Sequence, residues 1–146
     1  MSIADNKALT LRIFDTFNTH NAAATAALFA PDAVLNDVAV SRPAVGREQI
    51  AEVYARHLVA IPDTLVRVER LVAEGETVAA EWTIRGTHQG RLLGIPATGR
   101  AVTIIGVSLI RFRDGLPVAD TRVWDFAGLL RQIGLLPGRN VEGAGT

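Results

Sequence analysis

The 146-residue chain contains no cysteine, which excludes disulfide bonds, thiol nucleophiles and thiolate metal sites. It also lacks any run of the roughly 18 apolar residues that a membrane-spanning helix needs. The first residues, Met-Ser-Ile-Ala-Asp-Asn-Lys, have no apolar segment of the kind found in signal peptides. These absences lead us to expect a cytoplasmic protein that makes no contact with a membrane.

An excess of charge of one sign is missing as well. The chain has 15 basic and 15 acidic residues, so it offers no general electrostatic attraction for nucleic acid. Hydrophobic residues make up 49% of the sequence, which is enough for a sizeable core at this length. We expect one domain over residues 1–136, followed by a flexible tail over residues 137–146.

Apolar side chains recur at helical spacing in the first half of the chain. The pattern predicts helices over residues 6–19 and 22–29, a short strand over residues 33–37 and a loop over residues 41–46. A third helix ends before Pro62, and its apolar stripe consists of Ile50, Val53, Tyr54, His57, Leu58 and Ile61. We expect the core to bury Ile50, Val53, Tyr54, Leu58 and Ile61.

The second half of the chain changes to the period of two that is typical of strands. This pattern predicts strands over residues 64–74, 78–88, 100–113 and 117–124. Asp125 is placed to cap a final helix over residues 126–133. Helices followed by neighbouring antiparallel strands predict an α+β fold.

Residues 86–134 carry motifs that resemble a known family. They read Gly-Thr-His-Gln-Gly, then Gly-Ile-Pro-Ala-Thr-Gly-Arg, and end with Val-Trp-Asp-Phe-Ala-Gly-Leu-Leu-Arg-Gln-Ile-Gly. This unit resembles the C-terminal half of the SnoaL-like polyketide cyclases, within the NTF2-like superfamily. The resemblance implies a cone in which a curved antiparallel sheet wraps around N-terminal helices and encloses a pocket. It also implies a homodimer formed through the outer face of the sheet.

The resemblance aligns Arg122 with the general acid/base Asp of the family and Ser108 with its His. It therefore implies that the face of the last strand bearing Val118, Asp120, Arg122 and Trp124 points inward. Asp120 and Arg122 can form an ion pair on that face. The pair would either orient a substrate or serve as a structural salt bridge at a sheet edge or dimer contact. Ser108 can hydrogen-bond a ligand but is no general base near neutral pH.

Two further catalytic candidates lie at strand ends. His88 is in phase with Trp82, and histidine is the residue type whose unperturbed pKa suits acid/base chemistry, although His88 could simply fix the 89–98 loop. Asn36 and Asp37 end the first strand, and one of them should point inward. Asp37, Arg122 and Asp120 would then form an Asp-Arg-Asp cluster, which resembles the site of the epoxide-hydrolase branch of the superfamily. The catalytic candidates are thus Arg122, Asp120, Asp37 and His88.

The expected pocket lies between the sheet and the first and third helices. Trp82, Ser108, Arg122 and Trp124 are predicted to line it, and Gly106 could leave room for a flat ligand or mark a bulge. The substrate-binding candidates, for which core packing is the alternative, are Trp82, Ser108, Trp124, Asn36, Tyr54, His57 and Phe14. The three histidines have no metal-ligand spacing, so we expect no metal site. We expect His20 to be solvated. We also expect no cofactor.

Three functions remain open at this point. The resemblance implies acid/base cyclisation of the aldol type, or isomerisation, of a flat, oxygenated, mostly apolar small molecule. The second function is hydration, hydroxylation or epoxide opening in the same pocket, with Arg122 and a carboxylate orienting water. The third is binding of a small molecule without catalysis.

Overall fold

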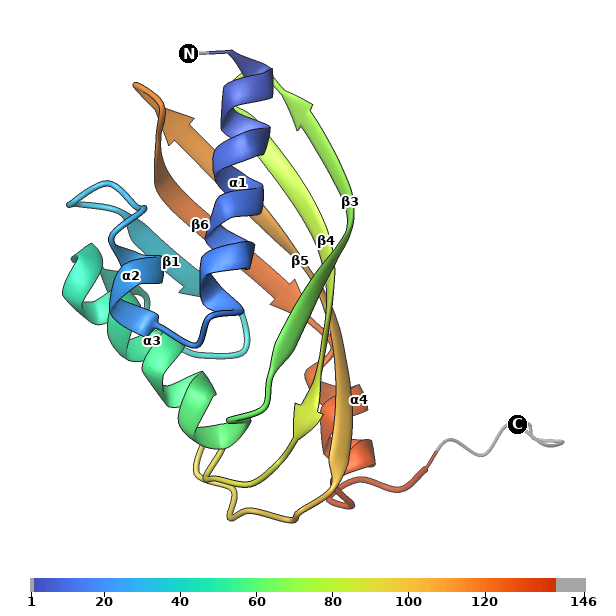
Figure 1. Ribbon diagram of the computed structural model, residues 1–146. Helices are drawn as coiled ribbons and strands as arrows, with labels where there is room; N and C mark the ends of the chain where they lie inside the picture. The colour runs from blue at the N-terminus through green and yellow to red at the C-terminus, as the bar shows by residue number, and fades with distance from the viewer. Residues whose placement is uncertain (1, 139–146) are drawn as a thin grey trace, which may run out of the picture.

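The computed structural model describes residues 2–138 and shows an α+β fold (Figure 1), which confirms the predicted fold class. The strongly curved sheet has helices across its concave face, and a short helix lies at one end beside the fifth strand. Of the predicted tail, residues 139–146 lie outside the described part. No helix in residues 2–138 is long and apolar enough to cross a membrane.

Three of the helices begin at polar residues that capping chemistry favours. Helix α1 (Ile3–Phe17) starts with a capping box between Ser2 and Asp5. The side chain of Asn21 caps α2 (Ala22–Ala26), which is shorter than predicted. Asp125 accepts a hydrogen bond from the Gly128 N–H and begins α4 (Phe126–Gln132), the capping role that the sequence suggests.

Six strands form one sheet in the order β2-β1-β6-β5-β4-β3. Their bounds are β1 (Val34–Asp37), β2 (Ala44–Val45), β3 (Leu65–Glu74), β4 (Thr77–Thr87), β5 (Ala101–Arg113) and β6 (Leu116–Trp124). Strands β3 to β6 are antiparallel neighbours, whereas β1 runs parallel to β6. Strand β2 lies within the segment predicted as a loop, and it pairs with β1.

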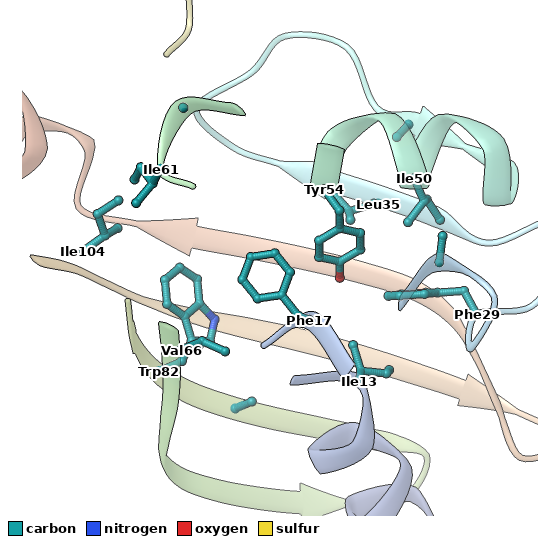
Figure 2. Close-up of a cluster of buried hydrophobic side chains, with 14 of the residues drawn as sticks. Ile13, Phe17, Phe29, Leu35, Ile50, Tyr54, Ile61, Val66, Trp82 and Ile104 are labelled. Atoms are coloured by element: carbon teal, nitrogen blue, oxygen red, sulfur yellow. The ribbon is translucent and has the colours of Figure 1, made fainter. Parts of the chain in front are cut away.

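The main core fills the space between the concave face and the helices. Figure 2 shows Phe17 from α1 between Tyr54 from α3 (Gly46–Ala60) and Trp82 from the sheet, with Ile104 beyond Trp82. The rings of Phe17 and Tyr54 lie 5.4 Å apart between centroids. This packing holds α1 and α3 against the concave face of the sheet.

Helix α3 buries a narrower stripe than its sequence suggests. Ile50, Tyr54 and Ile61 are buried, as predicted. Val53 and Leu58 are half-buried where they pack against the core, so they are less buried than the sequence predicts. The stripe spans more of the helix surface than the concave sheet can cover, and its margins remain accessible.

Candidate functional site

The inner face of β6 carries a buried ion pair. Asp120 and Arg122 point inward, as the family resemblance implies, whereas Val123 lies on the outer face and is 51% exposed. The Arg122 Nη2 donates to Asp120 Oδ2 at 2.9 Å, and the two side chains are 16% and 2% exposed. The register places Ser108 of β5 directly opposite Arg122. The pair therefore lies inside the cone.

The same guanidinium reaches the third helix. Arg122 Nη2 also donates to the Tyr54 hydroxyl oxygen at 3.1 Å, and the Arg122 Cζ lies 5.3 Å from the centre of the Tyr54 ring. Burial alone would lower the pKa of Arg122, but the negative charge of Asp120 and the contact with Tyr54 outweigh it and raise this pKa. Arg122 therefore keeps its charge in a buried position.

Two polar atoms of this cluster have no hydrogen-bond partner among residues 2–138. They are Asp120 Oδ1, an acceptor, and Arg122 Nε, a donor, and both are inaccessible to solvent. A buried polar group without a partner costs about 1–3 kcal/mol, so such atoms are uncommon unless they serve a purpose. The cluster thus combines a carboxylate oxygen and an N–H group that are both unused within the fold.

Asp37 does not join this cluster. The parallel pairing of β1 and β6 places Asp37 beside Arg122 in the backbone register. Its Oδ1 nevertheless accepts hydrogen bonds from Trp124 Nε1 at 2.8 Å and from the Ala39 N–H. Within the described residues the salt bridge of Arg122 is to Asp120 alone, so the predicted Asp-Arg-Asp cluster is not formed. The indole N–H of the half-buried Trp124 thus has its acceptor in Asp37.

Asn36 points the other way. It is exposed, whereas Leu35 before it is 1% exposed and Asp37 after it is half-buried. Because side chains alternate along a strand, the residue of this pair that is directed inward is Asp37. The structure therefore does not support Asn36 as a residue of the inner site.

Ser108, Trp82 and Gly106 form one packed unit on the inner face. The Trp82 Nε1 donates to Ser108 Oγ at 3.0 Å, and both residues are buried. A Cβ atom at Gly106 would lie 2.6 Å from Cη2 of Trp82. The space that Gly106 leaves is thus occupied by the Trp82 ring, which corrects the expectation of room for a flat ligand or a bulge at this position.

His88 is fully buried at the end of β4. Its Nδ1 shares a 2.9 Å hydrogen bond with Thr98 Oγ1, while its Nε2 has no partner among the described residues. The backbone of His88 also bonds to Arg100 and Gly99 across the base of the 89–98 loop. These contacts are those of a histidine that fixes the loop, and a catalytic role for His88 stays a prediction.

His57 and His20 meet at Thr64. The half-buried His57 shares a 2.9 Å hydrogen bond between Nε2 and Thr64 Oγ1, and its ring packs edge-on against Phe17. Burial, followed by the positive charges of Arg122 and His20, lowers the pKa of His57 to about 4. His20 is exposed, as predicted, but its Nε2 bonds to the Thr64 carbonyl oxygen at 2.7 Å.

Two open hollows lie away from the ion pair. One of about 510 Å³ is bordered by residues of β3 and β4 together with Asn18 and Asp63. The other, of about 420 Å³, is bordered by Trp82, Trp124 and outward residues of β4 to β6. Neither includes Arg122 or Ser108. Phe14 and Trp124 are half-buried against the main core, and a cavity shared by all four predicted lining residues stays a prediction.

The sequence does not predict the contact between Tyr54 and Arg122. It predicts Tyr54 as a buried residue of the third helix and a pocket wall, and nothing local relates it to a residue 68 positions away. In residues 2–138, no three His, Asp or Glu side chains gather so that they could hold a metal ion. The cluster that remains is a carboxylate, a guanidinium and a phenol.

Similar proteins agree with this architecture. A family model described as SnoaL-like polyketide cyclase matches residues 8–133. The nogalonic acid methyl ester cyclase of Streptomyces nogalater is 42% identical over 66 residues, which are 44% of this chain and 48% of that protein. The aklanonic acid methyl ester cyclase of Streptomyces peucetius is 43% identical over 61 residues, 41% of each chain. These matches therefore span less than half the length of the curated relatives.

A solved structure matches over nearly the whole chain. AclR, a proposed hydroxylase from Streptomyces galilaeus, has 29% sequence identity and a TM-score of 0.83, with 95% of this chain and 91% of that chain covered. The motifs of residues 86–134, the curved sheet and the family model over residues 8–133 point to the same group of proteins. This chain belongs to the SnoaL-like polyketide cyclase family.

Proposed function

We propose that this protein catalyses ring closure of a flat, oxygenated polyketide by acid/base chemistry without a cofactor. The observation that carries the proposal is the buried Asp120 carboxylate, whose Oδ2 is held by Arg122 while its Oδ1 is unused. A carboxylate with one free oxygen is suited to remove a proton from carbon. The relatives that act on nogalonic and aklanonic acid methyl esters suggest the substrate class.

The proposed reaction is an intramolecular aldol addition. Asp120 Oδ1 removes a proton from the carbon beside a carbonyl group, and the electron pair passes to the carbonyl oxygen to form an enolate. The enolate carbon then bonds to a second carbonyl carbon in the same molecule. The alkoxide formed there recovers the proton from Asp120. Arg122 keeps the carboxylate in place throughout, because its charge persists when buried.

A substrate would reach these atoms only after side chains move. Asp120 Oδ1 and Arg122 Nε are shielded from solvent, and the core residues Phe17, Tyr54 and Trp82 occupy the space in front of the sheet (Figure 2). Binding would therefore displace core side chains in front of the ion pair, while Tyr54 stays in contact with Arg122. The binding energy of the apolar part of the ligand would offset this displacement.

The central test is turnover of the methyl esters of nogalonic and aklanonic acid. We expect the parent protein to cyclise at least one of them, and Asp120→Asn to lower kcat by a factor of about 100 or more, the loss typical of a general base. Asp37→Asn serves as a comparison, because it changes a carboxylate that is bound to Trp124 instead of Arg122. Full activity of Asp120→Asn on a confirmed substrate would exclude Asp120 as the base.

A second candidate function is hydroxylation or hydration. It is suggested by the match to AclR, a proposed hydroxylase, which covers 95% of this chain at 29% identity. In hydration Asp120 and Arg122 would orient the water that adds to the substrate. In hydroxylation they would orient the substrate, while dioxygen as the oxidant supplies one oxygen atom and its other atom leaves as water with two electrons from a reductant. Mass spectrometry detects hydration after incubation in ¹⁸O-labelled water and hydroxylation after incubation under ¹⁸O-labelled dioxygen with a reductant, whereas cyclisation leaves the mass of the substrate unchanged.

We further propose a homodimer through the outer face of β5 and β6. Ile105, Val107, Leu109 and Val123 are 38–54% exposed there, and Val107 lies opposite Val123. Such a contiguous apolar patch is typical of a protein interface. We expect a dimer in sedimentation analysis of the parent and a monomer for Val107→Lys. Val38→Lys, at a 55% exposed valine just after β1, should stay dimeric, and a monomeric parent protein would refute the proposal.

A further inference from the structure

Tyr54 is placed so that its hydroxyl proton is available to a ligand. The hydroxyl oxygen already accepts a hydrogen bond from Arg122 Nη2 at 3.1 Å. Among residues 2–138 this is the hydroxyl group's one hydrogen bond, and it uses a lone pair instead of the proton. A phenol that accepts from a cation is polarised toward donation, so its O–H is a stronger donor than that of a free phenol.

Three unused hydrogen-bonding positions therefore lie on or beside the Arg122 guanidinium. Tyr54 O–H and Arg122 Nε–H are donors, and Asp120 Oδ1 is an acceptor. A substrate carbonyl group with an acidic C–H on the neighbouring carbon complements these three groups. The carbonyl oxygen accepts hydrogen bonds from the two donors, and the proton of the C–H group faces the Asp120 carboxylate. The arrangement supplies a base and hydrogen-bond donors to the same three-atom unit of a substrate.

We propose that Tyr54 is a further catalytic residue, which donates its hydroxyl proton as a hydrogen bond to the carbonyl oxygen that becomes the enolate oxygen. The inference rests on the proposed cyclisation. In that reaction the electron pair released from carbon settles on this oxygen, and Tyr54 and Arg122 Nε stabilise the negative charge by hydrogen bonds. Tyr54 keeps its proton throughout, because Asp120 both removes and returns the proton that moves.

The surroundings of Tyr54 suit a neutral donor held in a fixed position. Its ring packs against Phe17 and Phe29, with centroids 5.4 and 6.4 Å away, so the hydroxyl is directed by the core. Burial raises the pKa of Tyr54, an effect that the charge of Arg122 opposes. The phenol is thus protonated near neutral pH, and its donor is prearranged before charge develops.

Tyr54→Phe is the direct test, because it removes the hydroxyl and keeps the ring. With the methyl ester of nogalonic or aklanonic acid as substrate, we expect kcat to fall about 100-fold or more, as on removal of an oxyanion donor, while KM changes little. Thr10→Val is the control, since it removes another buried hydroxyl, one that donates to Asn6 O within α1. Thr10→Val should retain parent kcat.

A measurement independent of turnover uses 4-nitrophenol, whose absorbance reports whether it is ionised. A donor that stabilises an oxyanion lowers the pKa of the bound phenol, so the parent protein should bind it as phenolate and Tyr54→Phe should not. Tyr54 is also the only tyrosine in the chain. Fluorotyrosine labelling therefore gives one ¹⁹F signal, which should shift when 4-nitrophenol binds, even if Tyr54→Phe fails to fold.

The outcomes separate the two proposals. If the parent cyclises neither ester but shifts the ionisation of 4-nitrophenol in a Tyr54-dependent manner, the reaction is wrong and the donor role is supported. If Tyr54→Phe keeps parent kcat and ionises the probe as the parent does, the role of Tyr54 is overturned while cyclisation stands. A parent protein with no turnover, no ionisation of the probe and no change in the ¹⁹F signal overturns both.

Discussion

Replacing Arg122 by Met is expected to destabilise the protein by about 3–5 kcal/mol, because it leaves the Asp120 carboxylate buried without its partner. Asp120 is 2% exposed and its ion pair is 2.9 Å long, so solvent cannot take the place of the guanidinium. Chemical denaturation measures the loss directly as a lower free energy of unfolding.

The double variant Asp120→Leu with Arg122→Met is the matched control. Replacing both members of a buried pair by apolar side chains is often neutral in its effect on stability, so most of the loss should be recovered. Arg122→Lys should lie between the parent and Arg122→Met, since one ammonium group cannot reproduce the contacts to both Asp120 and Tyr54. A loss below about 1 kcal/mol for Arg122→Met would mean that the pair behaves as a surface salt bridge.

Acidification is expected to destabilise the protein through His57 before most carboxylates titrate. The folded state holds the pKa of His57 at about 4, below the ordinary value of 6.5, so the unfolded chain binds the proton more readily. The contribution of His57 is therefore fully present above about pH 6.5 and is lost as the pH falls toward about 4. Between about pH 7 and pH 5 this amounts to about 2 kcal/mol.

His57→Gln tests this prediction, because an amide can still bond to Thr64 Oγ1 but does not titrate. Unfolding by urea near neutral pH gives the reference stability of each protein, and the same measurement near pH 5 gives the change. The parent should lose more stability than His57→Gln over this interval, by about the predicted amount. Parallel losses in the two proteins would show that His57 is no more buried than an ordinary surface histidine.

Local patterns were enough to predict most of the secondary structure. The four long strands and the Asp125 cap appear within a few residues of the expected positions, because alternation, turns and caps depend on neighbours in the chain. The pairing of Asp120 with Arg122 was accessible for the same reason, since residues two apart share a face of a strand. Strand β2 was missed because two residues carry no periodicity.

Contacts between distant segments could not be predicted in this way. Asp37 was expected beside Arg122, and the parallel register does place it there, but its side chain turns to the indole N–H of Trp124. The sequence around Gly106 does not predict that the Trp82 ring occupies the space where a Cβ atom of residue 106 would lie. These contacts depend on which hydrogen-bond donor lies close to which acceptor in the interior. Many side-chain arrangements fit the same sequence pattern, and the packing of the whole core selects one of them.

The α+β class, the inward phase of Asp120 and Arg122 and the family can all be predicted from the sequence, because they follow from periodicity and from motifs within residues 86–134. Three contacts depend on the folded core instead: Tyr54 shares a guanidinium with Asp120, Asp37 accepts from Trp124, and His57 bonds to Thr64. Hydrogen bonds in a desolvated interior form between groups that are close in three dimensions, and the order of residues along a strand or helix does not specify that proximity.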